Sequence, residues 1–113
     1  MVGIVVVSHS AELARGVVEL ARQMGGEEVR VEEAGGMDDG SIGTDAVRVH
    51  AAIERAMSDD GVLVLMDLGS ALMSAEMAVE LLGSDGRVVL SEAPLVEGAV
   101  AAAAAARGGG EAE

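Results

Sequence analysis

A histidine at the end of a short apolar run is the first residue in this sequence whose position could support chemistry. Residues Gly3 to Val7 are rich in Ile and Val, which is typical of a buried strand, and the run stops at Ser8-His9-Ser10. Helical spacing begins directly afterwards, so His9 sits where a strand meets the amino end of a helix. Free N–H groups and the positive end of the helix dipole favour a phosphate there. We therefore expect His9 to accept and hand on a phosphoryl group.

A nucleophilic histidine needs a group that holds its second ring nitrogen. An unperturbed imidazole titrates near pH ~6.5, so much of it is neutral and nucleophilic at cellular pH. Asp67 follows a second wholly apolar run, Val62 to Met66, whose end should lie beside that of the first strand. We predict that Asp67 orients His9, as an aspartate does in the Ser-His-Asp arrangement. A capping or packed histidine is the alternative interpretation of His9.

Four loops should meet at this edge of the sheet, because each follows a predicted strand. The second of them, residues 35–44, is rich in glycine and could bring N–H groups close to a ligand, although an ordinary flexible connection has the same composition. His50 lies inside a predicted helix, away from this edge, and is expected to be a surface or packing residue. The four loops contain Ser8-His9-Ser10, residues 35–44, Asp67-Leu68-Gly69-Ser70 and Glu92-Ala93-Pro94.

The elements that position these loops follow from the hydrophobic pattern. The first helix is expected to end at Gly25-Gly26, and residues 28–33 alternate as in a strand near a sheet edge, with Val29 and Val31 on one face. Thr44 is the expected N-cap of the second helix. The apolar side of the first helix comprises Leu13, Ala14, Val17, Val18, Leu20, Ala21 and Met24.

The second half of the chain continues the same alternation. Ser70 is the expected N-cap of a helix over residues 71–82, which is apolar around its whole circumference. That distribution favours a subunit interface, with deep burial in a monomer as the alternative. A turn is expected at residues 83–86, a strand at 87–92, an alanine-rich helix at 95–107 and a disordered acidic tail at 108–113.

Strands and helices that alternate with short connections predict one α/β domain over residues 1–107. Such a chain forms an open, mostly parallel four-stranded sheet with helices on both faces. We place the strands in the order 2-1-3-4, because the two most apolar strands should be central. The length of 113 residues suffices for one core and is too short for two.

Composition and missing motifs exclude several functions. The formal net charge of −13 argues against a nucleic-acid groove and against docking on an anionic membrane. The absence of cysteine excludes disulfides and thiolate chemistry, and the paired aspartates in turns lack a third ligand, so no metal site is expected. Neither GxxxxGK[ST] nor GxGxxG follows a strand, so we expect no nucleotide cofactor. No membrane span or signal peptide is recognisable, and the expected location is the cytoplasm.

Four segments together resemble a known family. They are GIVVVSHSAELARGVVELARQM, AGGMDDGSIGTD, VLVLMDLGSALMSAEMAVELL and SEAPLVEGAVAAA, and the resemblance covers residues 2–106. The family is that of the phosphotransfer subunits of phosphoenolpyruvate-dependent dihydroxyacetone kinases, which carry a mannose-type enzyme IIA domain of the bacterial sugar phosphotransferase system. The first segment is shared with mannose-type IIA domains in general, whereas DLGSA and PLVEGA point to the dihydroxyacetone branch.

The resemblance implies a mechanism and a set of partners. His9 would accept phosphate at Nε2 from the histidine phosphocarrier protein and pass it to ADP on a nucleotide-binding kinase subunit, while Nδ1 faces Asp67. A third subunit would hold dihydroxyacetone, and dihydroxyacetone phosphate would be the product. The resemblance also implies a homodimer. The residues it implies for cradling phosphate or contacting partners are Ser10, Gly40, Thr44, Gly69 and Ser70.

Three alternative functions share the same sequence features. A IIA domain of a mannose-type sugar transporter would use the same histidine and differ in its acceptor. A regulatory binding module would use its phosphohistidine only as a signal. A plain α/β ligand-binding domain would use no covalent step at all.

Overall fold

Four strands alternate with four helices along the chain. The computed structural model describes residues 1–83 and 87–107, so the expected turn at 84–86 and the expected acidic tail at 108–113 lie outside the described residues. No described helix is long and apolar enough to cross a membrane. In chain order the elements are β1 (Gly3–Ser8), α1 (Ala11–Gly25), β2 (Val31–Gly35), α2 (Ala46–Ala56), β3 (Val62–Met66), α3 (Ala71–Leu82), β4 (Val88–Ser91) and α4 (Leu95–Arg107).

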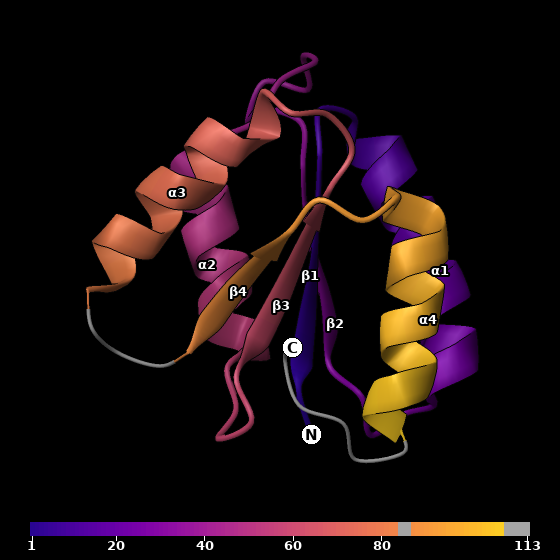
Figure 1. Cartoon of the computed structure of the whole chain (residues 1–113). Coiled ribbons are helices and arrows are strands. Elements are labelled where there is room, and N and C mark those ends of the chain that lie inside the picture. Colours follow the sequence, from indigo (N-terminus) through magenta and orange to yellow (C-terminus); the bar gives the residue numbers. More distant parts are fainter. Residues whose placement is uncertain (84–86, 108–113) are drawn as a thin grey trace.

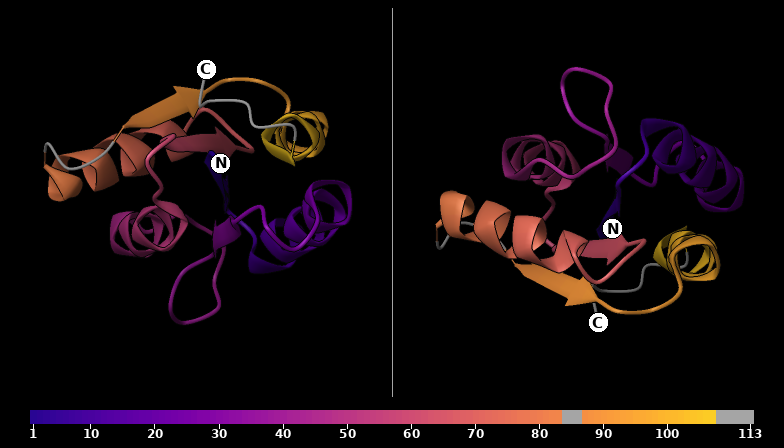
Figure 2. Two further views of the ribbon diagram at one scale, coloured as in Figure 1. Left: turned by 90° about the horizontal axis from the view of Figure 1, so that it is seen from below. Right: turned by 90° about the horizontal axis from the view of Figure 1, so that it is seen from above.

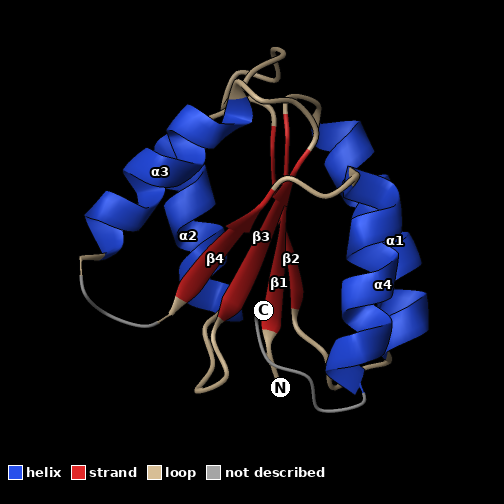
Figure 3. Cartoon of the chain, viewed as in Figure 1, coloured by secondary structure: helices blue, strands red, loops and turns tan. Residues whose placement is uncertain are grey.

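All four strands are parallel and lie in the order β2-β1-β3-β4, which confirms the predicted sheet. Helices α1 and α4 cover one face of the sheet, and α2 and α3 cover the other (Figure 1). The two views along the strands show the sheet as a twisted layer between these helix pairs (Figure 2). The loops that follow the carboxyl ends of the strands gather at one end of the molecule (Figure 3).

Alternate residues of the central strands build two separate cores. Ile4 and Val6 of β1 pack toward α1 and α4, whereas Val5 and Val7 pack toward α2 and α3. Small side chains on the helices complete both cores, as at Ala75 of α3. Alanine lets a helix backbone lie close to the sheet, so a core without any aromatic residue can still be filled.

The second strand begins later than the sequence predicts. It starts at Val31 instead of Glu28, because its neighbour in the sheet, β1, starts at Gly3 and the register pairs Ile4 with Val31. The preceding residues form a turn. Val29 and Val31 are both buried in the same core, so the predicted shared face is confirmed.

Two helices bury a narrower face than their sequences suggest. In α1 the buried side chains are Ala14, Val17, Val18 and Ala21, while Leu13, Leu20 and Met24 are exposed. The sheet and α4 cover only one stripe of the helix, which leaves its flanks in solvent. In α3 the buried residues are Ala71, Ala75 and Ala78, and the larger Met73, Met77 and Leu81 are exposed, so α3 is not a deeply buried helix of a monomer.

Candidate functional site

His9 and Asp67 meet because their strands are neighbours. Strand β1 pairs with β3 in a register that places Val7 opposite Met66, so Ser8-His9 and Asp67 follow at the same edge of the sheet. The N–H of Asp67 donates to the carbonyl of Val7 at 3.1 Å. The side chains then meet directly, with His9 Nδ1 at 2.9 Å from Asp67 Oδ1. The predicted pairing of these two residues is therefore present.

The carboxylate of Asp67 accepts four hydrogen bonds. Its Oδ1 accepts hydrogen bonds from His9 Nδ1 and, at 2.8 Å, from the N–H of Leu68. Its Oδ2 accepts hydrogen bonds from the N–H of His9 at 3.0 Å and from the hydroxyl of Ser8 at 2.9 Å. Partial burial acts to raise the pKa of Asp67, but the hydrogen bonds from His9 and Ser8 outweigh it and hold the pKa below its ordinary value. Asp67 is therefore a firm acceptor for one ring nitrogen of His9.

The other ring nitrogen of His9 lies beside a hydroxyl. Ser70 Oγ is 2.8 Å from His9 Nε2. Because an ionised carboxylate can only accept, Nδ1 carries the proton in neutral His9 and Nε2 carries the lone pair, to which the Ser70 hydroxyl donates. Ser70 occupies the predicted N-cap position of α3, yet its side chain makes no capping bond. The contact with His9 takes the hydroxyl away from the helix end.

The two other predicted hydroxyl residues do not contact the ring of His9. Ser10 is the N-cap of α1, and its hydroxyl accepts from the N–H of Leu13 at 3.3 Å. Thr44 was expected to cap α2, but Asp45 is the N-cap and accepts from the N–H of Val47 at 2.9 Å. The hydroxyl of Thr44 instead lies 2.6 Å from that of Ser74 on α3. This contact, the Thr44–Ser74 pair, fixes the end of the glycine-rich loop to α3.

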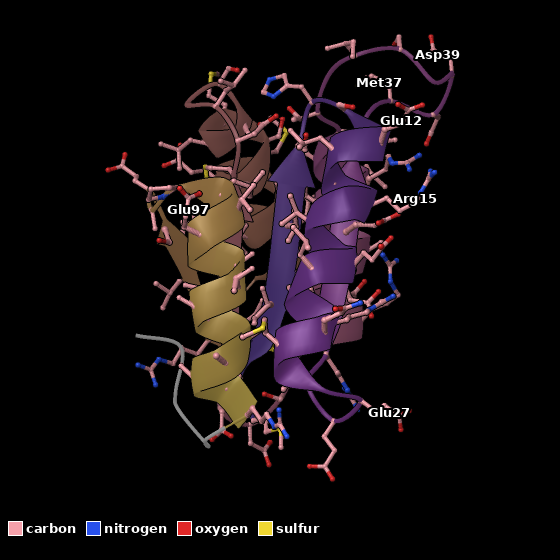
Figure 4. The ribbon with its side chains drawn as sticks, turned by 90° about the vertical axis from the view of Figure 1, so that its right-hand side faces the viewer. Glu12, Arg15, Glu27, Met37, Asp39 and Glu97 are labelled. Atoms are coloured by element: carbon pink, nitrogen blue, oxygen red, sulfur yellow. The ribbon has the colours of Figure 1, made fainter. Side chains whose placement is uncertain are left out.

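The glycine-rich loop holds the backbone of the histidine segment. The N–H of Gly43 donates to the carbonyl of His9 at 2.8 Å, and the N–H of Gly36 donates to the carbonyl of Ser8 at 3.2 Å. Gly40 forms an exposed turn with a φ of 85°, which favours glycine, and its N–H donates to Met37. Figure 4 shows Met37 and Asp39 on this loop beyond the amino end of α1. The loop thus reaches the site through its two ends.

The last predicted loop also reaches this edge. Glu92 and Pro94 line a hollow of about 250 Å³ together with Asp67, Gly69 and Leu72. Gly69 is exposed there and is open on the side where a Cβ would stand. The hollow lies between Asp67 and the loop that follows β4.

Three residues make contacts at the site that the sequence did not predict. Ser8 is fully buried and binds Asp67, Gly43 binds the backbone of His9, and Ser74 binds Thr44. Only Ser8 carried a recognisable signal, since it is the polar residue that ends an apolar strand immediately before the histidine. His50, expected to be unrelated to the site, lies in α2 and pairs with Glu54 at 3.3 Å.

Comparison with known families places this arrangement in a class. The model of the mannose-type IIA family, described as the PTS system fructose IIA component, matches residues 3–113. The chain therefore belongs to the IIA components of the phosphotransferase system.

The curated relatives of the chain indicate which group within this family it belongs to. The chain is 51% identical over 98% of its length to a protein of Escherichia coli K12 described as the phosphoryl donor subunit DhaM of PEP-dependent dihydroxyacetone kinase. It is 38% identical over 91% of its length to the corresponding subunit of kinase 2 in Listeria innocua, of which it covers 84%. Within the IIA family, the chain belongs with these phosphoryl donor subunits. It spans about a quarter of the Escherichia coli relative, of which it covers 25%.

A solved structure shows the same fold. It is described as EF1359, a protein of unknown function, and matches with a TM-score of 0.79 at 34% identity. The match covers 97% of this chain and 86% of that one. The similarity therefore extends over nearly the whole chain.

Proposed function

We propose that this chain is a phosphoryl carrier in which His9 is phosphorylated transiently at Nε2. The observation that supports the proposal most is the pair of contacts on the imidazole. Asp67 Oδ1 lies 2.9 Å from Nδ1, and this leaves the lone pair on Nε2, the nitrogen that faces outward toward Ser70. The side chain of His9 is 19% exposed, enough for a partner to reach that nitrogen.

The transfer has two balanced steps. In the first, the lone pair of Nε2 attacks the phosphorus of a donor phosphohistidine, so a new N–P bond forms as the N–P bond of the donor breaks. In the second, an oxygen of the terminal phosphate of ADP attacks the same phosphorus, ATP forms and the electron pair returns to Nε2. The proton stays on Nδ1 throughout, hydrogen-bonded to Asp67, and the carboxylate stabilises the positive charge that the phosphorylated ring develops.

The surrounding residues have supporting roles in this proposal. The hydroxyl of Ser70 turns from Nε2 to a phosphoryl oxygen when the N–P bond forms, because a hydroxyl can donate to either. Gly69 and Gly40 offer exposed backbone at the rim of the site, and Ser10 marks the amino end of α1, where a negative charge is favoured. Thr44 acts indirectly, by anchoring the glycine-rich loop to α3.

Membership of the family supports a proposal for the donor and the acceptor. We propose that the histidine phosphocarrier protein supplies the phosphoryl group and that an ADP-binding dihydroxyacetone kinase subunit accepts it. Two relatives from Listeria innocua that match over most of their own length are described as phosphoryl donor subunits of PEP-dependent dihydroxyacetone kinases. We place this activity in the cytoplasm, within one domain formed by residues 1–107.

We also propose a homodimer. Helix α3 presents Met73, Met77 and Leu81 at positions i, i+4 and i+8, and each of these side chains is more than half exposed. Beside them, a hollow lined by Met37, Val47, Met73 and Met77 continues the apolar surface toward α2. A second copy that covers this stripe would remove a contiguous apolar surface from water.

Phosphoryl transfer can be tested with purified components. The protein is mixed with labelled phosphoenolpyruvate, enzyme I and the histidine phosphocarrier protein, and the acid-labile phosphate on it is measured before and after addition of the ADP-loaded kinase subunit. We expect labelling followed by rapid discharge. His9→Ala should fold normally and remain unlabelled, whereas His50→Ala should behave like the wild type.

The outcomes separate the alternatives. Label on the His9→Ala variant would show that another residue is the carrier. Label that persists in the presence of the ADP-loaded kinase subunit would instead indicate a transporter component or a regulatory module. A wild-type protein that takes up no label would refute the carrier function.

A further inference from the structure

Ser8 stands out in the described chain as the one polar side chain that is fully buried. It is the last residue of β1, on the face that Ile4 and Val6 fill with apolar contacts toward α1 and α4. A buried hydroxyl is costly unless its hydrogen bonds are made. The Ser8 hydroxyl donates to Asp67 Oδ2 at 2.9 Å and accepts from the N–H of Ser10 at 3.0 Å.

These bonds place Ser8 behind the carboxylate that holds the histidine. Of the four hydrogen bonds that Asp67 accepts, two come from the backbone N–H groups of His9 and Leu68 and one from the ring of His9. The hydroxyl of Ser8 is the only other side-chain donor among the described contacts of this carboxylate. It also links Asp67 to Ser10, the N-cap residue of α1, because it accepts a hydrogen bond from the N–H of Ser10.

We propose that Ser8 is a positioning residue for phosphoryl transfer, which keeps the Asp67 carboxylate in the plane that holds the proton on His9 Nδ1 and the lone pair on Nε2. The proposal rests on the proposed function of His9. Without the hydroxyl, Oδ2 keeps only the backbone N–H of His9, and the carboxylate group can rotate about its Cβ–Cγ bond. Rotation moves Oδ1 away from Nδ1, so a larger share of His9 carries its proton on Nε2 and cannot attack phosphorus.

Two variants and one control test this role. Ser8→Ala removes the hydroxyl, and Ser8→Cys keeps a side chain of similar shape with a weak donor. Val6→Ala is the control, because Val6 lies on the same face of β1, is equally buried and belongs to the apolar core packed toward α1 and α4. It lowers stability by loss of packing and leaves the hydrogen bonds of the carboxylate in place.

The decisive readouts are the ¹⁵N chemical shifts of the His9 ring, which report the tautomer, and the rate of phosphorylation by the histidine phosphocarrier protein. We expect both Ser8 variants to shift the tautomer toward Nε2–H, and Ser8→Ala to slow phosphorylation about tenfold, as for loss of one hydrogen bond to a charged group. Val6→Ala should keep the wild-type tautomer and rate per folded molecule.

The possible failures are distinguishable. If both folded Ser8 variants keep the wild-type tautomer and rate, the positioning role is refuted while His9 remains the carrier. A change of equal size in Val6→Ala would likewise refute it, by reducing the effect to lost stability. If the wild-type protein takes up no phosphate, the proposed function itself fails.

Discussion

Asp67 determines which nitrogen of His9 can react. Its Oδ1 faces Nδ1 at 2.9 Å, and both of its oxygens accept hydrogen bonds, because the ionised carboxylate carries no proton to donate. The reactivity of His9 in our account therefore depends on a residue 58 positions away in the chain. Substitution of that residue separates orientation from nucleophilicity, because the imidazole itself is unchanged.

Asp67→Asn should slow phosphorylation of His9 by about a hundredfold or more while the fold is retained. An asparagine amide cannot accept at both positions, so its NH₂ group faces either the ring or the donors on the Oδ2 side. A donor that faces Nδ1 selects the tautomer with the proton on Nε2. Rapid-quench measurement of phosphohistidine formation checks this, and an unchanged rate would remove Asp67 from the mechanism.

The pKa of Asp67 also predicts a pH dependence of stability. The folded-state pKa lies below the ordinary value of about 3.9 for aspartate, so ionised Asp67 stabilises the folded protein. That stabilisation is present above the unfolded-state pKa and is lost as the pH falls through the lowered folded-state value. The difference in free energy of unfolding between wild type and Asp67→Asn should therefore be larger at pH 7 than near pH 3. Urea unfolding at the two pH values measures it, and an equal difference would contradict this assignment.

At the scale of elements, α3 connects the site to the glycine-rich loop. Ser70 and Ser74 lie four residues apart, on one side of the helix, and bind His9 and Thr44 respectively. The loop in turn binds the carbonyl of His9 through Gly43. The histidine segment, the loop and α3 therefore form a closed ring of contacts, and a break at any one contact should loosen the others.

The Thr44–Ser74 pair can be tested by a double-mutant cycle. Thr44→Val and Ser74→Ala should each lower the free energy of unfolding by about 1 kcal/mol, because each leaves a part-buried hydroxyl without its partner. The double variant should lose no more than either single variant does, since the second hydroxyl no longer lacks a partner. Urea unfolding measures all three, and fully additive losses would show that the pair is not coupled.

The sequence predicted elements better than it predicted the bonds at their ends. Continuous apolar runs identified β1 and β3, and the bounds of α4 at Leu95 and Arg107 were as expected. The helix caps were less predictable, because Thr44 and Ser70 have the right chemistry for a cap and are instead held by contacts with Ser74 and His9. The partner of a hydroxyl is decided by tertiary neighbours, which local pattern does not contain.

The same limit applied within the site. His9 and Asp67 could be paired from sequence because each ends an apolar strand, and parallel neighbours deliver such ends to one edge. The hydrogen bond from Ser8 to Asp67 could not be predicted, because alternation along the strand decides only which face Ser8 occupies. Its bond to Asp67 depends on how the chain leaves the sheet after Val7 and Met66.

At the scale of the whole molecule, exposed apolar side chains are concentrated on two helices. Helix α3 carries its exposed Met73, Met77 and Leu81 together with two glutamates and no basic residue. An apolar stripe of this kind is the surface that we assign to a second copy. Helix α1 also exposes apolar side chains, and it provides the matched comparison.

Met77→Glu should convert the proposed dimer to a monomer, because it places a charge in the centre of the stripe. Leu20→Glu on α1 is the control, since Leu20 is 50% exposed and Met77 is 57% exposed, and the two helices cover opposite faces of the sheet. Sedimentation equilibrium should give a monomer mass for the first variant and a dimer mass for the second. A wild-type protein that is monomeric at high concentration would refute the dimer, and loss of the dimer in the control alone would move the interface to α1.

The nitrogen that carries the phosphoryl group distinguishes the proposed role of His9 from its alternatives. The protein can be labelled with ¹⁵N-histidine and phosphorylated by the histidine phosphocarrier protein, and the ring nitrogens of its two histidines can then be observed by NMR. Our account predicts that only His9 changes, that phosphorus is bonded to Nε2, and that Nδ1 keeps its proton beside Asp67. A phosphoryl group on Nδ1 of His9, or on His50, would contradict it.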